Sequence, residues 1–195
     1  MNPTRPLLSR EFVLAHRRSY MLDAVAELSG ERGYEAMTIS DIVKRAHVAR
    51  KTLYENYGGK EEVFLAAVDA AFAAALERTE AACAAGGREW RERVRAALAG
   101  LLEYLADHPA EAHMLIVEAP AATTASAARY QDAIVRLTAL LADATPAAEG
   151  PSDVIEEAVV GGAAWILNRQ IRRGEVEQVS GLTSELSEFV LAPWA

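Results

Sequence analysis

The sequence predicts an all-α protein, because three features favour helices over strands. Alanine, the strongest helix former, is abundant, most densely between residues 60 and 85. Apolar residues recur at spacings of three and four rather than two, which is the period of an amphipathic helix. Prolines and glycine pairs divide the chain into segments of helical length. We therefore expect a core built from packed helices.

The first two helices have recognisable start and stop residues. We expect the first over about Arg10–Arg32, ending at Gly33, because glycine suits the left-handed conformation of a helix cap. A short second helix should begin at Thr38, where Asp41 completes a capping box, and should end near residues 46–47. The apolar residues expected to be buried by the first helix are Met21, Leu22, Val25 and Leu28.

A turn and two glycine pairs bound the next two helices. The turn at residues 47–48 should lead into a third helix over about Ala49–Asn56. The glycine pair at 58–59 separates it from a long helix over Lys60–Ala85, which the pair at 86–87 ends. This long helix is suited to connect the first part of the chain with the rest.

Prolines mark the junctions of the remaining helices, because a missing backbone N–H does least harm there. The helices are expected near residues 89–106, 109–118, 122–144, 153–173 and 176–191. The prolines at the junctions are Pro109, Pro120, Pro146 and Pro151.

Charge is distributed unevenly along the chain. The net charge is -8 overall. Residues 1–60 hold ten Lys or Arg and seven Asp or Glu, which gives +3, so the other 135 residues carry -11. A basic part on an acidic part is typical of a DNA-contacting module attached to a module that does not contact DNA, although chance variation explains this asymmetry equally well.

Cysteine usage and hydropathy favour a cytoplasmic protein. Cys83 is the single cysteine, so no intrachain disulfide forms, and we expect it to pack rather than to act as a sensing thiol. The amino terminus has no apolar run of signal-peptide length, and no stretch is apolar and long enough to span a membrane.

The second and third expected helices favour a helix-turn-helix, whose second helix enters the major groove of DNA. Arg50, Lys51 and Thr52 lie at the amino-terminal end of that helix, which reaches base edges. The hydroxyl of Tyr54 suits a phosphate contact. Thr38 and Lys60 offer two further phosphate contacts.

Each of these residues also has an ordinary structural interpretation. Arg50, Lys51 and Lys60 are equally suited to be solvated charges, and Tyr54 and Tyr57 to be core aromatics. A capping role is sufficient to explain Thr38. Only the combination of these residues at these spacings favours DNA binding.

Three segments resemble the amino-terminal domain of the tetracycline-repressor (TetR) family of bacterial regulators. They are ERGYEAMTISDIVKRA, VARKTLYENY and GGKEEVF, which follow one another between residues 31 and 64. Their order and spacing match the family signature closely, and the resemblance covers about a quarter of the chain.

The resemblance implies roles for individual residues and for the whole protein. Thr38 and Lys60 would contact phosphates, and Arg50, Lys51 and Thr52 would sit in the groove. Tyr54 and Tyr57 would hold the recognition helix and touch the DNA backbone. The family further implies a homodimer paired through its last two long helices, with a small-molecule pocket in the carboxy-terminal part that changes the spacing of the two DNA-binding parts.

This sequence departs from the family pattern at four positions. His47 replaces the usual turn glycine and Ala49 a common capping serine. Lys51 replaces a small residue, and Ser29 an aromatic one. His47 should adopt a left-handed conformation, which histidine tolerates better than most residues. The added charge of Lys51 means that the operator sequence cannot be borrowed from a relative.

The carboxy-terminal part offers candidate interface and pocket residues. Asp153 with Glu156 is expected to cap a helix that begins an apolar surface. The candidate dimer residues are Ile155, Val159, Gly162, Trp165, Ile166, Leu182, Leu186 and Phe189, although such stripes equally suit an intramolecular core. The candidate ligand-contacting residues, chosen by type and region, are Tyr104, His113, Trp165 and Asn168, although a structural role suits each of them better.

These observations predict a three-part organisation and a homodimeric transcriptional repressor, which a small molecule bound in the carboxy-terminal part releases from a roughly palindromic operator. Residues 1–16 would form a flexible arm and the start of the first helix, 17–65 the DNA-binding domain, and 66–195 a ligand-binding and dimerisation domain. The partners would be double-stranded operator DNA, a second copy and a small-molecule effector, with no cofactor, metal or membrane. The alternatives are an activator of the same fold, a helical interaction module that has lost DNA binding, and a helical enzyme, for which no catalytic motif is present.

Overall fold

The computed structural model describes residues 10–144 and 152–194, and these ranges are helical with no strand, as the sequence predicts. In chain order the elements are α1 (Arg10–Ala36), α2 (Ile39–Arg45), α3 (Arg50–Asn56), α4 (Lys60–Ala85), α5 (Trp90–Asp107), α6 (Pro109–His113), the π-helix η1 (Met114–Glu118), α7 (Ala119–Ala122), α8 (Thr124–Ala144), α9 (Asp153–Arg172), the 3₁₀-helix η2 (Val176–Leu182), α10 (Thr183–Leu191) and the 3₁₀-helix η3 (Ala192–Trp194). Residues 1–9 of the expected arm over 1–16 lie outside the described ranges, as do the junction prolines Pro146 and Pro151.

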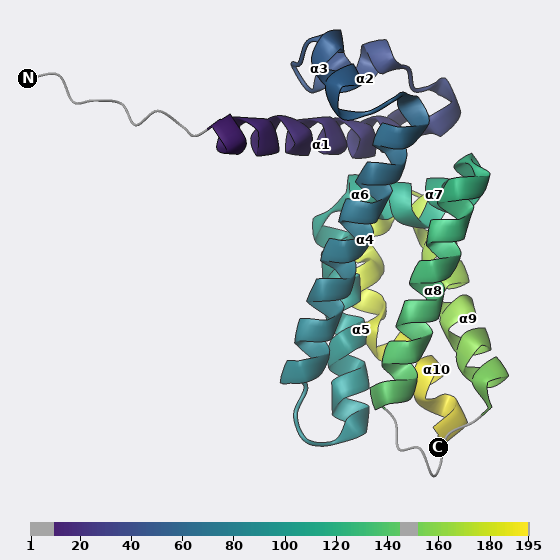
Figure 1. The fold of residues 1–195 in the computed structure, drawn as a ribbon. Helices are drawn as coiled ribbons and strands as arrows, with labels where there is room; N and C mark the ends of the chain where they lie inside the picture. Colours follow the sequence, from purple (N-terminus) through teal and green to yellow (C-terminus); the bar gives the residue numbers. More distant parts are fainter. Residues whose placement is uncertain (1–9, 145–151, 195) are drawn as a thin grey trace, which may run out of the picture.

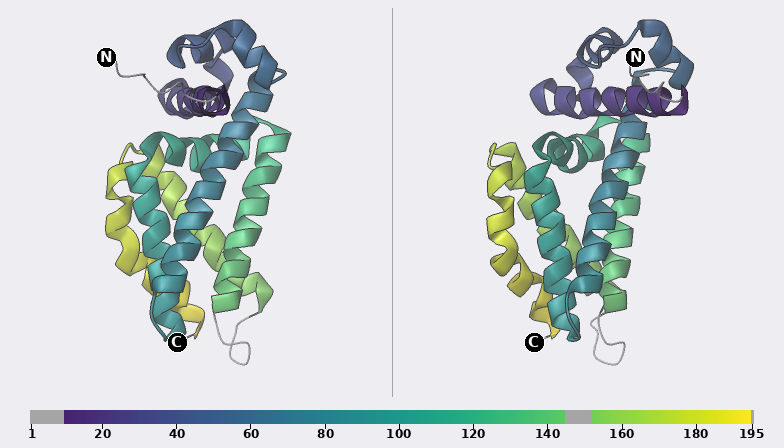
Figure 2. Two further views of the ribbon diagram at one scale, coloured as in Figure 1. Left: turned by 60° about the vertical axis from the view of Figure 1, so that its left-hand side comes forward. Right: turned by 90° about the vertical axis from the view of Figure 1, so that its left-hand side faces the viewer.

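The helices are arranged as two parts joined by α4 (Figure 1). We call α1 to α3 the head and α5 to η3 the body. The head lies across one end of an elongated bundle, with α1 nearly perpendicular to the long helices of the body (Figure 2). Helix α4 begins in the head and runs along the bundle beside α5 and α8.

The expected capping box at Thr38 and the left-handed His47 are confirmed, whereas Gly33 adopts a different backbone conformation from the expected left-handed cap. The hydroxyl of Thr38 accepts a hydrogen bond from the backbone N–H of Asp41 at 3.2 Å, and the backbone N–H of Thr38 donates to the Asp41 carboxylate at 3.0 Å. His47 has a φ of 52°, the left-handed conformation expected of a residue in the place of a glycine. Gly33 has φ 77° and ψ 164°, a region that is essentially glycine-only, so α1 is interrupted there and ends at Ala36.

Three details of the body differ from expectation. The segment 109–118 is an α-helical turn followed by the π-helix η1. The segment 176–191 is not one α-helix, because its first part is the 3₁₀-helix η2, in which Ser180 and Gly181 have low helix propensity. The cap of α9 is Ser152 rather than Asp153, and its carbonyl accepts hydrogen bonds from the backbone N–H groups of Ile155 and Glu156.

Two apolar clusters form the core, and the body contributes to both. The body cluster fills the space among α4, α5, α9 and α10. The head cluster packs α1, α2 and α3 against the start of α4. Met114, Leu115 and Ala119, which lie in η1 and at the start of α7, are at most 1% exposed and belong to the head cluster. The head therefore completes its core with side chains of the body.

A polar contact reinforces this junction. The Glu118 carboxylate, at the end of η1, accepts a hydrogen bond from the backbone N–H of Tyr34 at 2.7 Å. The ammonium of Lys60 donates to the Tyr34 carbonyl at 3.1 Å and lies 4.2 Å from the centre of the Tyr34 ring. We call Gly33, Tyr34, Lys60 and Glu118 the joint. It ties the end of α1 to η1 and to the start of α4.

Substitution of Gly33 should weaken the joint. A Cβ at Gly33 would lie 3.3 Å from the Glu118 carboxylate, in a conformation that other residues avoid. We expect Gly33→Ala to destabilise the protein by about 1–3 kcal/mol. Gly30→Ala is the matched control, since a Cβ there meets only ordinary contacts and alanine favours a helix by roughly 0.5–1 kcal/mol. Urea unfolding measures both, and equal effects would contradict this account of the joint.

The pH dependence of stability should report on His113, which lies beside the joint. Burial lowers the pKa of His113, with Arg172 adding to the effect and Glu118 opposing it. Below about pH 6.5 the unfolded chain takes up the proton more readily than the folded protein, so stability is lost as the pH falls through that value towards the lower folded pKa. The free energy of unfolding of His113→Gln should therefore fall less than that of the wild type between pH 7.5 and 5.5. A variant with the wild-type slope would exclude this role.

Candidate nucleic-acid interface and ligand pocket

The amino-terminal end of α3 presents polar side chains to solvent. Arg50 and Lys51 are exposed, and the side chain of Lys51 is 86% accessible. The Arg50 guanidinium lies 5.7 Å from the centre of the Tyr54 ring and 3.4 Å from its hydroxyl, and Tyr54 is half exposed. Thr52 is partly buried on the side that faces the end of α2. This end of α3 is available to a large partner.

The opposite face of α3 fixes the helix in the head. Leu53 is fully buried in the head cluster, and Tyr57, the carboxy-terminal cap of α3, is 4% exposed. The Tyr57 hydroxyl is buried without a hydrogen-bond partner among the described residues. Tyr57 therefore holds α3 through packing, as expected, whereas its burial does not fit the expected contact with a DNA backbone.

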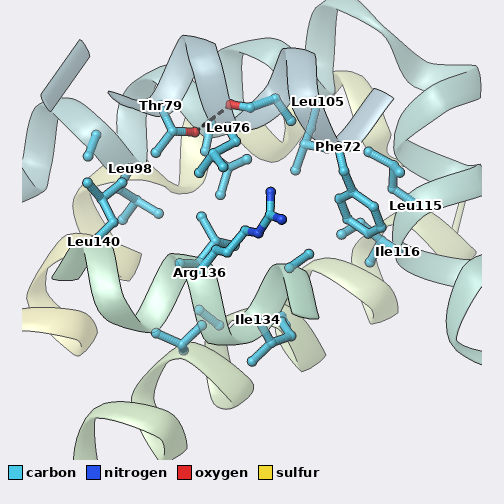
Figure 3. Close-up of a pocket in the computed structure, with 18 of the residues that line it drawn as sticks. Phe72, Leu76, Thr79, Leu98, Leu105, Leu115, Ile116, Ile134, Arg136 and Leu140 are labelled. Carbon is cyan, nitrogen blue, oxygen red and sulfur yellow. Dashed lines mark hydrogen bonds between the residues drawn. The ribbon is translucent and has the colours of Figure 1, made fainter. Parts of the chain in front are cut away.

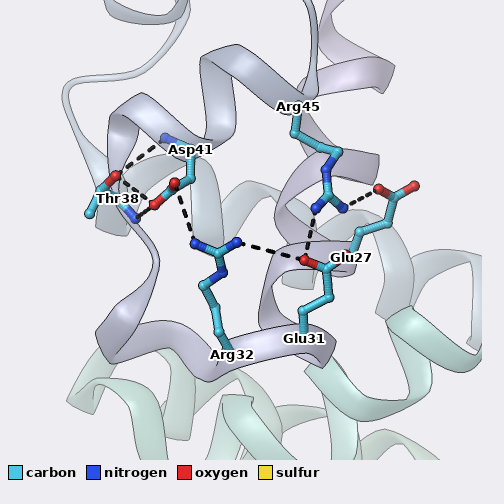
Figure 4. Close-up of polar contacts among 6 residues, drawn as sticks. All are labelled: Glu27, Glu31, Arg32, Thr38, Asp41 and Arg45. Atoms are coloured by element: carbon cyan, nitrogen blue, oxygen red, sulfur yellow. Dashed lines mark hydrogen bonds and ion pairs between the residues drawn. The ribbon is translucent and has the colours of Figure 1, made fainter.

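A chain of charged groups fixes α2 against α1 (Figure 4). The Arg45 guanidinium lies 2.7 Å from the Glu27 carboxylate and 2.8 Å from that of Glu31. Arg32 continues the chain, 3.8 Å from Glu31 and 3.4 Å from Asp41. The hydrogen bond from Arg45 lowers the pKa of the Glu31 carboxyl. A single exposed ion pair contributes little to stability. These ion pairs therefore orient α2 more than they stabilise the head.

Thr38 and Lys60 already have partners within the protein. The Thr38 hydroxyl donates to the Asp41 carboxylate at 2.7 Å, and this bond lowers the pKa of Asp41. The ammonium of Lys60 donates hydrogen bonds to the backbone carbonyls of Tyr34 and Glu35. Both residues stay partly exposed at the edge of the head, but each is preorganised by contacts that do not involve a ligand.

The body contains a cavity of about 360 Å³, within the range of roughly 300–1,000 Å³ that is typical of small-molecule sites. It lies among α4, α5, η1, α8 and α9 and is lined mainly by Leu, Ile, Ala and Val (Figure 3). Thr79 is one of its few polar residues, and its hydroxyl donates to the Ala75 carbonyl at 2.7 Å. Cys83 is buried and packs in the wall, as expected. The cavity is suited to a molecule with a large apolar part.

None of the four candidate ligand residues lines this cavity. Tyr104 donates a hydrogen bond to the Glu111 carboxylate, and its burial and this bond raise the pKa of the phenol. His113 packs beside the joint. Asn168 donates to the carbonyl of Ile116 at 2.6 Å, and Trp165 is 63% exposed on the outer face of α9. Of the four, Tyr104 and Asn168 have side chains that are hydrogen-bonded within the fold.

The charged residues of the cavity were missed by the sequence analysis. Arg129, Asp132 and Arg136 on α8, with Asp69 on α4, reach its lining. Their spacing of three or four residues places the α8 side chains on one helix face, a signal that was present in the sequence.

The candidate dimer residues divide into three groups by burial. Val159 and Leu186 are buried in the body cluster, so they serve the core of a single chain. Ile155, Trp165 and Phe189 are 43%, 63% and 41% exposed on α9 and α10. The half-buried remainder comprises Gly162, Ile166 and Leu182, and a Cβ at Gly162 would meet the Phe189 ring.

The part of the chain that the structure describes has neither a metal-binding cluster nor a membrane-spanning helix. Its His, Cys, Asp and Glu side chains form no group suited to hold a metal ion. None of its helices combines the length and hydropathy needed to cross a membrane.

Comparison with known proteins points to one family. Residues 21–67 match the family described as bacterial regulatory proteins, tetR family. The transcriptional activator FasR of Mycolicibacterium smegmatis is 29% identical over 109 residues, which is 52% of this chain and 46% of FasR. The chain spans about a third to a half of the length of the curated relatives it matches, and these are named as transcriptional regulators rather than enzymes.

Solved structures extend the similarity to almost the whole chain. A TetR-like regulator from Rhodococcus sp. RHA1 is 26% identical with a TM-score of 0.73, over 95% of this chain and 99% of that one. FadR of Bacillus subtilis, solved in complex with stearoyl-CoA, has a TM-score of 0.77 at 17% identity, over 90% of this chain and 98% of that one, and shares the fold. Residues 21–67 therefore form a helix-turn-helix DNA-binding domain of the tetR family of bacterial regulators, and almost the whole chain is similar in structure to a TetR-like regulator.

Proposed function

We propose that this protein is a cytoplasmic, homodimeric repressor, which binds a roughly palindromic operator and leaves it when a small molecule fills the body cavity. The exposed polar end of α3 carries this proposal, because α3 is held rigidly by its buried face. In this function residues 17–65 form the DNA-binding domain and 66–195 the domain for ligand binding and dimerisation.

The residues at the end of α3 have different roles in the proposed complex. Arg50 and Lys51 reach base edges in the major groove, where a guanidinium pairs well with guanine, and Thr52 lies beside them. Tyr54, Thr38 and Lys60 contact phosphates around that groove. Tyr57 acts indirectly, through the packing that orients α3.

An exposed apolar surface on α9 and α10 supports dimerisation. Val154 is 73% exposed, and Ile155, Trp165 and Phe189 extend the surface. Soluble proteins rarely leave neighbouring large apolar side chains in water unless a partner covers them. A second copy that covers this surface would make a symmetric pair with two recognition helices, as a palindromic operator requires.

The π-helix η1 supports a response to a ligand. Leu115 and Ile116 line the cavity, while Leu115 also belongs to the head cluster. Glu118 at the end of η1 accepts the hydrogen bond from Tyr34 in the joint, and Asn168 of α9 donates a hydrogen bond to the Ile116 carbonyl. Irregular helical turns of this kind often lie at functional sites. A molecule that displaces Ile116 would therefore move η1, on which the head packs, and so change the orientation of the head.

A transcriptional activator is the second candidate, because FasR is named as an activator. Both candidates bind DNA through α3 and differ only in the effect on the promoter. A reporter gene behind the bound site separates them, since deletion of the regulator raises expression under a repressor and lowers it under an activator.

Operator binding is the first test. Selection from a randomised duplex pool should enrich a palindromic site, and fluorescence anisotropy should show an affinity that falls steeply with salt. Arg50→Ala should weaken binding by about tenfold or more, since a good base contact contributes roughly 1–3 kcal/mol. Arg95→Ala, at an exposed position of α5, is the matched control and should bind normally. Absence of an enriched site, or binding insensitive to salt and sequence, would favour the interaction module that has lost DNA binding.

The dimer is tested separately by mass. Trp165→Asp places a charge in the exposed apolar surface and should halve the mass found by analytical ultracentrifugation, with an unchanged circular-dichroism spectrum. Val135→Asp is the control, because Val135 is 65% exposed on α8, outside that surface. A monomeric wild type, or a Trp165→Asp variant that stays dimeric, would contradict the proposed interface.

A further inference from the structure

Two arginines of α8 differ in how their charge is balanced. The Arg129 guanidinium lies 2.7 Å from the Asp69 carboxylate and also donates to a backbone carbonyl, so its charge is neutralised within the protein. Arg136 has no hydrogen bond or ion pair with any described residue. Asp132, one turn earlier on α8, also lines the cavity, but its carboxylate is beyond ion-pair distance of Arg136.

The side chain of Arg136 extends from α8 into the cavity, towards Leu76 and Thr79 of α4 (Figure 3). The walls around it are aliphatic and aromatic, with Leu98, Leu105 and Phe72 among them. Arg136 is an exposed residue, so its guanidinium contacts solvent as well as these walls. The apolar walls on one side lower the local dielectric constant and strengthen its attraction for an anion relative to bulk water. An unpaired cation at the cavity therefore selects the charge of the occupant.

From this arrangement we infer that the cavity binds an amphipathic anion, namely a long alkyl chain that ends in one carboxylate or phosphate group. The chain fills the apolar space between α4, α5 and α8, and the anionic group pairs with Arg136. The planar guanidinium donates two parallel hydrogen bonds to either group. The inference rests on the proposed ligand response and names its chemical class.

Binding to the full-length protein tests this class without any DNA. Isothermal titration calorimetry with dodecanoate, dodecyl phosphate and methyl dodecanoate compares two anionic groups with an uncharged one. The wild type should bind at least one anion about tenfold more tightly than the ester, as a hydrogen-bonded charge contributes. The preferred anion identifies the source, and octanoate should bind much more weakly than dodecanoate, since each buried methylene adds affinity.

Three variants assign the effect to Arg136. Arg136→Gln should lower the affinity for the preferred anion about tenfold and leave the affinity for the ester unchanged. Arg136→Lys should retain part of the preference, and Arg95→Gln, which changes an exposed arginine away from the cavity, should retain all of it. The unchanged ester affinity shows that the variant still folds.

Several results would overturn the inference. They are equal affinity for anion and ester in the wild type, no binding of either, or an Arg136→Gln variant that keeps the preference. Failure of the proposed ligand response gives a different result. The anion would then bind the protein normally, but its addition would not change the affinity for the selected operator.

Discussion

The packing of η1 into the head cluster is the constraint on which the rest of the structure depends. Met114 and Leu115 belong to the body by sequence, but they are buried against α1 and the start of α4. A well-packed core does not deform continuously, so a shift of η1 must move the head or leave a void. The orientation of α3 is therefore a property of both parts of the chain. The joint at Gly33 and Glu118 adds a polar contact to the same boundary.

The same segment, η1, also lies at the edge of the cavity, so it directly connects the cavity with the head. Ile116 lines the cavity and Glu118 binds the end of α1, two residues apart. An occupant with a long alkyl chain would contact Ile116 directly. Arg136 would select the charge of the group at the end of that alkyl chain. Coupling of this kind requires that the occupant bind one orientation of the head better than the other. The irregular backbone of η1 is suited to such a change, because π-helical turns within α-helices frequently lie at functional sites.

Local chemistry made much of the fold predictable from the sequence, and long-range packing limited the rest. The capping box at Thr38, the interruption at Gly33 and the left-handed His47 follow from single residues and their backbone preferences. The cavity was not predictable, because Leu98 or Leu140 in its wall has the same pattern as a core residue. Tyr104 and Asn168 were misleading, since buried polar groups are usually bonded within the protein. The apolar stripes of α9 and α10 likewise divide between core and surface only once the helices are packed.

Hydrogen exchange with and without the preferred amphipathic anion tests most directly whether the cavity and the head are coupled. The backbone amide of Tyr34 is bonded to Glu118, so its protection reports on the joint. The account predicts that the anion protects residues 114–118 and also changes the exchange of residues 33–38, with both changes lost in Arg136→Gln. Protection confined to the body, with residues 33–38 unchanged, would contradict it.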